Sequence, residues 1–206
     1  MIHEVDEALR SLIGTRALPG VITDIQFDAP TRNWAARRNS PTVNVYLYDI
    51  REEVAWRERG AVAVRDKDGK IIARRQPPRW FRLSYLVTAW TTRPEDEHRL
   101  LSALLILLLQ HEAIPRDTLT GTLAELNVSI PMSVAVPPSE SRSIADLWSA
   151  LGGELKPSLD MVVLAPFVAS AEYPVGPPVL EETITVRDRR GEIVDSATRD
   201  YRNRLP

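Results

Sequence analysis

A strand followed directly by a long helix limits the fold of this chain more than any other feature. Residues 80–90 alternate between apolar and polar side chains, which is typical of a strand in a sheet. Pro94 and the three acids after it predict the first turn of a helix that runs to residue 112. From Leu100 this helix is apolar almost all round, so we expect it to be buried on most sides, with a neighbouring subunit as a candidate to cover part of it. The pair builds a core and carries no catalytic motif.

The remaining segments predict more strands and two further helices. Apolar residues at helical spacing predict helices over 2–16 and about 140–151. Alternating or dense apolar stretches predict a hairpin over 62–73 and strands over 21–27, 42–49, 132–136 and 159–168, the last in the centre of a sheet. The stretches 29–41 and most of 115–138 are expected to be loops.

These elements predict an α/β (α+β) fold. We expect a single domain over 1–170, with a mixed, mainly antiparallel sheet packed by two or three helices. Prolines at 174, 177 and 178 mark a linker, so 171–206 is expected to be a C-terminal extended arm. Residues 64–72 resemble residues 186–194, and the turn chemistry of two hairpins is sufficient to explain that likeness.

Several function classes lack their residues. The chain has no cysteine, and P-loop, GxGxxG, GxSxG and HExxH motifs are missing. His98 and His111 lie about 20 Å apart along one helix, too far for one metal ion. We therefore assign no catalytic, cofactor-binding or metal-binding residue and expect no enzyme. The first residues show no signal peptide and the apolar run 100–109 is too short to span a bilayer, so we expect a cytoplasmic location without membrane insertion.

Charge is unevenly distributed along the chain. The net charge is −2, which argues against a nucleic-acid partner. Residues 32–82, however, hold 13 basic and 6 acidic side chains, a net charge of +7 that leaves −9 for the rest. Such polarity suits contacts between copies or with an acidic partner, although a solvated basic hairpin would give the same numbers. Only three of the 26 basic residues are lysines; arginine suits interfaces, but a coding bias explains this equally well.

Four ordered segments resemble the cap, or tail-terminator, proteins of phage-tail-like contractile injection systems. They read PTVNVYLYDI over 41–50, LSYLVTAW over 83–90, EHRLLSALL over 97–105 and DLWSALGGELKPSL over 146–159. The resemblance covers about residues 1–170. It implies a non-enzymatic protein that forms a six-fold homo-hexameric ring at the distal end of the inner tube and sheath. Such a ring ends polymerisation and anchors the last sheath ring, with the inner tube protein and the sheath protein as partners.

The same resemblance assigns two candidate contact sets. The basic loop and hairpin are expected to meet the tube or a neighbouring subunit, through Arg32, Trp34, Arg37, Arg38, Arg65, Lys67, Lys70, Arg74 and Arg75. The arm is expected to reach the sheath or a neighbouring subunit, through Val179, Ile184, Val186, Ile193 and Val194. Deleting the arm should spare folding and weaken sheath attachment. Two alternatives stay open from the residues alone: a phage head–tail connector, and a small ligand-binding or hydrolase domain.

Overall fold

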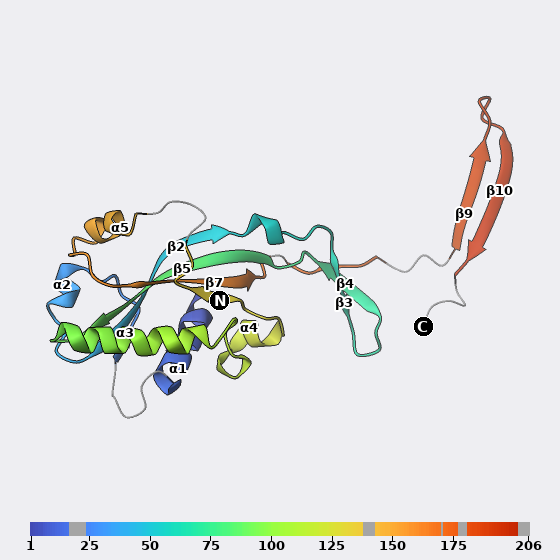
Figure 1. Cartoon of the computed structure of the whole chain (residues 1–206). Coiled ribbons are helices and arrows are strands. Elements are labelled where there is room, and N and C mark those ends of the chain that lie inside the picture. Colours follow the sequence, from blue (N-terminus) through green and yellow to red (C-terminus); the bar gives the residue numbers. More distant parts are fainter. Residues whose placement is uncertain (17–23, 138–142, 170, 177–180, 202–206) are drawn as a thin grey trace. The chain divides into compact units, whose positions relative to one another are not determined.

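The computed structural model describes residues 1–16, 24–137, 143–169, 171–176 and 181–201. The chain packs as two units. The first holds residues 1–58 and 78–168, and the second holds 59–77 and 169–206 (Figure 1). That residues 1–170 form one domain and residues 171–206 an arm stays a prediction.

The first unit is built on a five-stranded sheet in the order β1–β2–β5–β7–β6. β1 pairs with β2 in parallel, and every other described neighbour pair in this sheet is antiparallel. The predicted mixed, mainly antiparallel sheet is therefore confirmed. Its strands are β1 (Asp24–Gln26), β2 (Thr42–Glu52), β5 (Arg79–Trp90), β6 (Met132–Val134) and β7 (Leu159–Phe167).

β5 is the middle strand of this sheet. β7 is also an interior strand, because it pairs with β5 on one side and with the short edge strand β6 on the other. The dense apolar stretch 159–168 therefore forms an interior strand of the sheet, as predicted.

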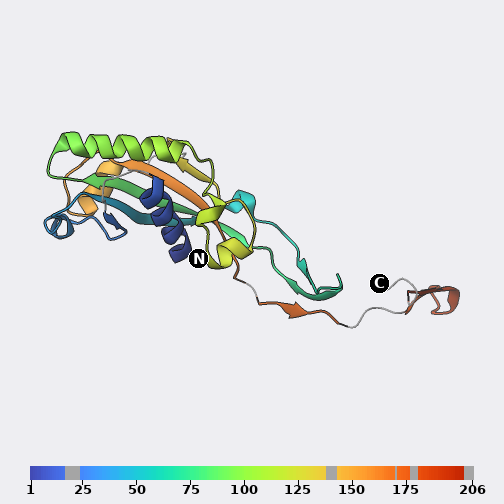
Figure 2. The same ribbon diagram turned by 90° about the horizontal axis from the view of Figure 1, so that it is seen from below.

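Helices cover both faces of this sheet. α1 and α3 lie on one face, below the strands in Figure 1 and seen from below in Figure 2, and α5 lies on the opposite side. The helical segments of the unit are α1 (Ile2–Arg16), α2 (Arg32–Ala35), η1 (Val54–Trp56), α3 (Pro94–Leu109), η2 (Arg116–Thr118), α4 (Gly121–Glu125) and α5 (Ile144–Ala150).

The main core lies between the sheet and the pair α1 and α3. Strand register places Val45 opposite Val87 and Tyr85 opposite Met161, and all four side chains are buried. Tyr85 also donates a hydrogen bond from its hydroxyl to Asp6 of α1, at 2.8 Å. Burial raises the pKa of both groups, most strongly that of the Tyr85 hydroxyl. The hydroxyl therefore stays protonated, and its hydrogen bond to Asp6 holds α1 against the sheet.

The second face of β2 is covered as well. Asn44 is fully buried there and donates from Nδ2 to the carbonyl of Asp28, at 2.9 Å. Trp34 and Trp148, the buried tryptophans of α2 and α5, provide apolar surface beside Trp90, which ends β5.

Three expectations about helices need correction. Within the single chain, α3 is buried on one side only: five leucines are buried and Leu105 packs partly buried against the core, whereas Ile106 and Leu109 are exposed. Cover by a neighbouring subunit stays a prediction. The stretch 29–41, predicted as a loop, contains α2, whose first turn is capped by Thr31. The stretch 115–138 contains η2 and α4 besides β6.

The second unit contains β strands only among its described residues. A three-stranded sheet in the order β3–β4–β8 holds the predicted hairpin, with β3 (Val62–Arg65), β4 (Ile71–Arg75) and β8 (Tyr173–Pro174). The predicted arm holds a second hairpin, made of β9 (Glu181–Arg187) and β10 (Ile193–Asp200). All residues of β9 and β10 are exposed.

Candidate interaction surfaces

The basic loop before β2 is built over a tryptophan. Trp34 is only 4% exposed and meets Trp90 edge-on, with ring centroids 5.3 Å apart. The Arg38 guanidinium lies over the Trp34 ring at 4.7 Å. Arg32 and Arg37 are exposed beside it. The three arginines surround a buried Trp34 ring, which lies beneath Arg38 and is not available to a partner. Their contact with a partner stays a prediction.

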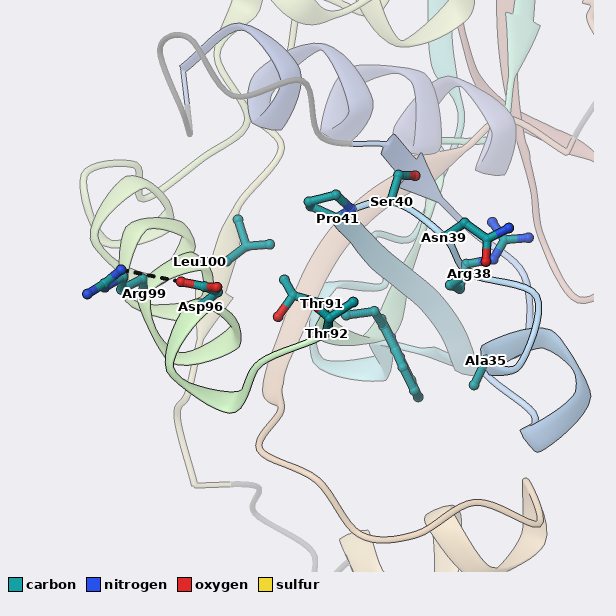
Figure 3. Close-up of a pocket in the computed structure, with 11 residues that line it drawn as sticks. Ala35, Arg38, Asn39, Ser40, Pro41, Thr91, Thr92, Asp96, Arg99 and Leu100 are labelled. Atoms are coloured by element: carbon teal, nitrogen blue, oxygen red, sulfur yellow. Dashed lines mark hydrogen bonds and ion pairs between the residues drawn. The ribbon is translucent and has the colours of Figure 1, made fainter.

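A hollow of about 590 Å³ lies next to Arg38 (Figure 3). One wall comes from the segment after α2, including Arg38 and Pro41, and the other from the end of β5, the connection after it and the first turns of α3. Asp96 and Arg99 form an ion pair on the second wall, at 3.3 Å. The lining of the hollow thus combines apolar surface with three charged side chains, Arg38, Asp96 and Arg99.

Lys156 joins the segments on which the family resemblance depends. Its Nζ donates to the carbonyl of Ala89 at 2.9 Å and to Oε1 of Glu97 at 2.7 Å, and lies 3.9 Å from the centre of the Trp90 ring. Glu97 also accepts the backbone N–H of Thr91, at 3.2 Å. The end of β5, the start of α3 and the segment after α5 are therefore held together by one lysine. Sequence reasoning missed this residue because a single lysine in a loop carries no local pattern.

The remaining predicted contacts lie on the second unit. Arg65, Lys67, Lys70, Arg74 and Arg75 belong to β3, β4 and the turn between them, so the structure gathers them on one hairpin. The four residues 32, 34, 37 and 38 are gathered on the first unit. The predicted set is thus two separate groups.

The predicted arm contacts include four described residues and one residue that the structure does not describe. Ile184, Val186, Ile193 and Val194 are exposed on β9 and β10, as a contact role requires. Val179 lies outside the described residues.

The two hairpins turn in the same way. In the first, the Asp66 carboxylate accepts the backbone N–H groups of Asp68 and Lys70, at 3.0 and 2.9 Å. In the second, Asp188 accepts those of Arg190 and Glu192, at 2.8 and 2.9 Å. In each turn an arginine, at 65 or 187, donates to the carbonyl of a glycine with positive φ, at 69 or 191. The sequence echo is therefore confirmed as shared turn chemistry.

One carboxylate, that of Glu52, binds two arginines near the two points where residues 59–77 join the first unit; we call this arrangement the carboxylate clamp. Glu52 at the end of β2 accepts paired hydrogen bonds from Arg57 and Arg79, with Nε to Oε1 distances of 2.9 and 2.8 Å. Trp56 packs edge-on against Trp80, with ring centroids 5.0 Å apart. Both arginines bind in the fork geometry that guanidinium groups offer to carboxylates.

We expect the pKa of Glu52 to depend on its hydrogen bonds to Arg57 and Arg79. The hydrogen bonds from Arg79 and Arg57 lower the pKa of Glu52 from 4.5 to about 2. A depressed pKa adds stability above the unfolded value, and this stability is lost as the pH falls from about 4.5 to 2. Replacing both residues, Arg57→Gln with Arg79→Gln, should return the titration midpoint toward 4.5, as measured by NMR of the carboxyl carbon. A midpoint that stays near 2 in the double variant would show that other groups set it.

Neither a metal cluster nor a membrane helix is found in the described part of the chain. No three histidine, cysteine or acidic side chains there gather in a way that could hold a metal ion. No helix within those same ranges is long and apolar enough to cross a membrane.

Residues 4–181 match the family model of the Pvc16 N-terminal domain. The chain belongs to this family. A search of the curated proteins found no match. Membership confirms the resemblance to cap and tail-terminator proteins that the four segments indicated.

Two solved structures share the fold of this Pvc16 N-terminal domain protein. One is the PVC sheath/tube terminator of an extracellular contractile injection system in its extended state, with 22% identity, a TM-score of 0.68 and coverage of 91% of this chain and 64% of that one. The other is the tube-terminating cap of the anti-feeding prophage, with 22% identity, a TM-score of 0.63 and coverage of 89% and 60%. The chain spans less than two thirds of the length of either protein.

Proposed function

We propose that this protein is the cap of a contractile injection system. It forms a six-fold ring at the distal end of the inner tube and sheath, ends their polymerisation and anchors the last sheath ring. The observation that carries the proposal is the family match over residues 4–181 together with the shared fold of two terminator caps. The role is structural and needs no catalysis, and the particle is assembled in the cytoplasm.

The basic patch of the first unit is the proposed tube contact. Arg32 and Arg37 are exposed, and Arg38, which lines the hollow, lies over the buried ring of Trp34. A patch supported by a buried aromatic ring keeps its shape, so little side-chain ordering is needed when it binds. The basic hairpin β3–β4 gives a second contact for the tube or a neighbouring subunit, and the arm hairpin gives the contact for the sheath or a neighbouring subunit.

Tube length is the direct test. Purified tube protein should polymerise to shorter tubes when the full chain is added, with rings visible at tube ends by negative-stain microscopy. Reversing two charges, Arg32→Glu with Arg37→Glu, should weaken this effect roughly tenfold while leaving the thermal midpoint unchanged, because both side chains are exposed.

A matched control carries the same change of charge elsewhere. Arg93→Glu with Arg116→Glu alters two exposed residues of the first unit, outside both predicted contact sets, and should leave tube termination intact. Tubes that keep their full length with the unaltered chain would overturn the cap function. Equal losses in the two double variants would show that total charge matters and that the patch does not.

A further inference from the structure

The arm hairpin is folded but has no core of its own. Ile184 and Val186 of β9 are 45% and 51% exposed, and Ile193 and Val194 at the start of β10 are 59% and 67% exposed. An isolated two-stranded hairpin is marginally stable in water, and apolar side chains on it gain stability only when another surface covers them. Within the described residues, β9 and β10 pair only with each other. Each strand therefore presents one open edge of backbone N–H and C=O groups.

Hydrogen bonds in the turn between β9 and β10 hold the hairpin in a fixed shape. The Asp188 carboxylate binds two backbone N–H groups of the turn, and Arg187 closes it on the carbonyl of Gly191, at 2.9 Å. Across the strands, the hydroxyls of Thr183 and Thr198 lie 3.2 Å apart. These contacts fix the register of β9 against β10, so the arm offers a defined strand rather than a flexible segment.

A matching edge exists on the same chain. β3 is the outer strand of the sheet β3–β4–β8, and in the described ranges its other edge has no partner. Val62 and Val64 occupy alternate positions of β3, as Ile184 and Val186 do on β9. Val62 and Ile72 expose 44% and 47% of their surface on this hairpin. Two strands with apolar residues at the same spacing can pair edge to edge and cover each other's side chains.

The charges of the two hairpins are complementary. Residues 62–75 hold five basic and two acidic side chains, a net charge of +3. Residues 181–201 hold four basic and six acidic side chains, a net charge of −2. Opposite charge favours approach of the arm to the β3–β4 hairpin and disfavours pairing of one arm with another.

We propose that the arm hairpin of one copy adds to the open edge of β3 in the next copy of this chain. The inference rests on the proposed ring. In a closed ring each copy must offer two different surfaces, one that gives and one that receives, and the arm and the β3 edge are such a pair. Addition of a strand to an open edge supplies the backbone hydrogen bonds that both hairpins lack. The occupant of the edge is thus a second copy, and contact with the sheath is the competing outcome.

Cysteine cross-linking tests the contact cleanly because the chain has no cysteine. We would prepare Val62→Cys and Ile184→Cys as separate full-length proteins and mix them on polymerised tubes under mild oxidation. Disulfides form only between residues whose Cα atoms lie within about 7 Å. The mixture should give cross-linked dimers, and each variant alone should give none. Val136→Cys, an exposed position of the first unit, replaces Val62→Cys in the control mixture, which should stay uncross-linked.

The outcomes separate this contact from the cap function. Tubes that are shortened normally but carry no cross-link would overturn the arm contact and leave the cap function standing. Dimers from Ile184→Cys alone would show arm-to-arm pairing, and loss of the cross-link when sheath protein is added to the mixture would assign the arm to the sheath; either result overturns the proposal. A cross-link within one chain of the double variant Val62→Cys with Ile184→Cys, at high dilution, would overturn it as well.

A charge exchange gives an independent readout. In the cross-linking pair, Arg74→Glu with Arg75→Glu on the receiving copy should abolish the cross-link, and so should Glu181→Arg with Glu182→Arg on the arm. Combining the two sets should restore the cross-link, because the signs are complementary again. Losses without restoration would overturn the role of charge in the contact. The altered side chains lie on hairpins of the second unit, so the thermal midpoint of the first unit serves as the folding control.

Discussion

Gly121→Ala is expected to lower the free energy of unfolding by about 3 kcal/mol. Gly121 begins α4 with a φ of +55°, a conformation that disfavours any side chain. An added Cβ would also lie 3.0 Å from Oε1 of Glu4 and 3.1 Å from its Cδ. This carboxylate is buried and accepts the backbone N–H of Leu123 at 3.0 Å, so its displacement would break the contact that holds α4 on α1.

The acidity of Glu4 agrees with that role. Burial raises and the Leu123 N–H lowers the pKa of the carboxyl, and the balance leaves this pKa below its ordinary value. The charged form is therefore the one that the folded chain binds. Pushing it away from this donor weakens the hydrogen bonding of a buried charge, which is the larger part of the expected loss.

Gly152→Ala is the matched control for this prediction. Gly152 has a similar φ of +65°, but an added Cβ would meet nothing within 4 Å. Only the conformational cost remains, so we expect a loss of about 1 kcal/mol. Urea unfolding of both variants measures the difference. Equal losses would contradict the role assigned to Glu4.

Lys156→Met should cost about 2–3 kcal/mol, the second large effect we expect. Methionine keeps the length and the apolar stem of the side chain. It loses the ion pair with Glu97, in which both side chains are only 16% exposed, and the contact of the ammonium group with the Trp90 ring, and it leaves the Glu97 carboxylate without its cation. The connection after α5 would then detach more easily from the end of β5 and the start of α3.

A double-mutant cycle isolates the ion pair. Lys156→Met combined with Glu97→Gln should cost less than the sum of the two single losses, because the glutamine removes the unpaired charge and still accepts the Thr91 N–H. Arg99→Met breaks the pair with Asp96, where Arg99 is 82% exposed, and should cost about 0.5 kcal/mol or less. Additive losses in the cycle would argue that Lys156 acts through packing alone.

Local patterns were sufficient wherever a segment's own residues decide its structure. The sequence predicted the alternation of β5, the apolar spacing of α1 and the Asp-x-x-Gly turns of both hairpins. These features could be predicted because side-chain periods and turn residues act over a few positions. The family resemblance followed from the same segments. Candidate surfaces were predicted from basic stretches and from apolar stretches expected to be exposed. The arginines at 32 and 37 are exposed as expected.

Contacts between distant residues had to be seen in the tertiary structure. Glu4 and Leu123 lie 119 positions apart, and Lys156 and Glu97 lie 59 apart, so no window of sequence contains either pair. Trp34 was read as a surface residue because its neighbours are arginines, and only the packing of Trp90 beneath them buries it.

The sequence by itself therefore determined the fold class, the longer strands and helices and the family, but it did not indicate α2, η2 or α4. The tertiary structure decided which strand is central, which side of α3 stays exposed and that the basic residues form two groups on separate units. The physical reason is the range of the interactions: periodicity and turn chemistry are local, whereas burial and ion pairing depend on what the rest of the chain brings close.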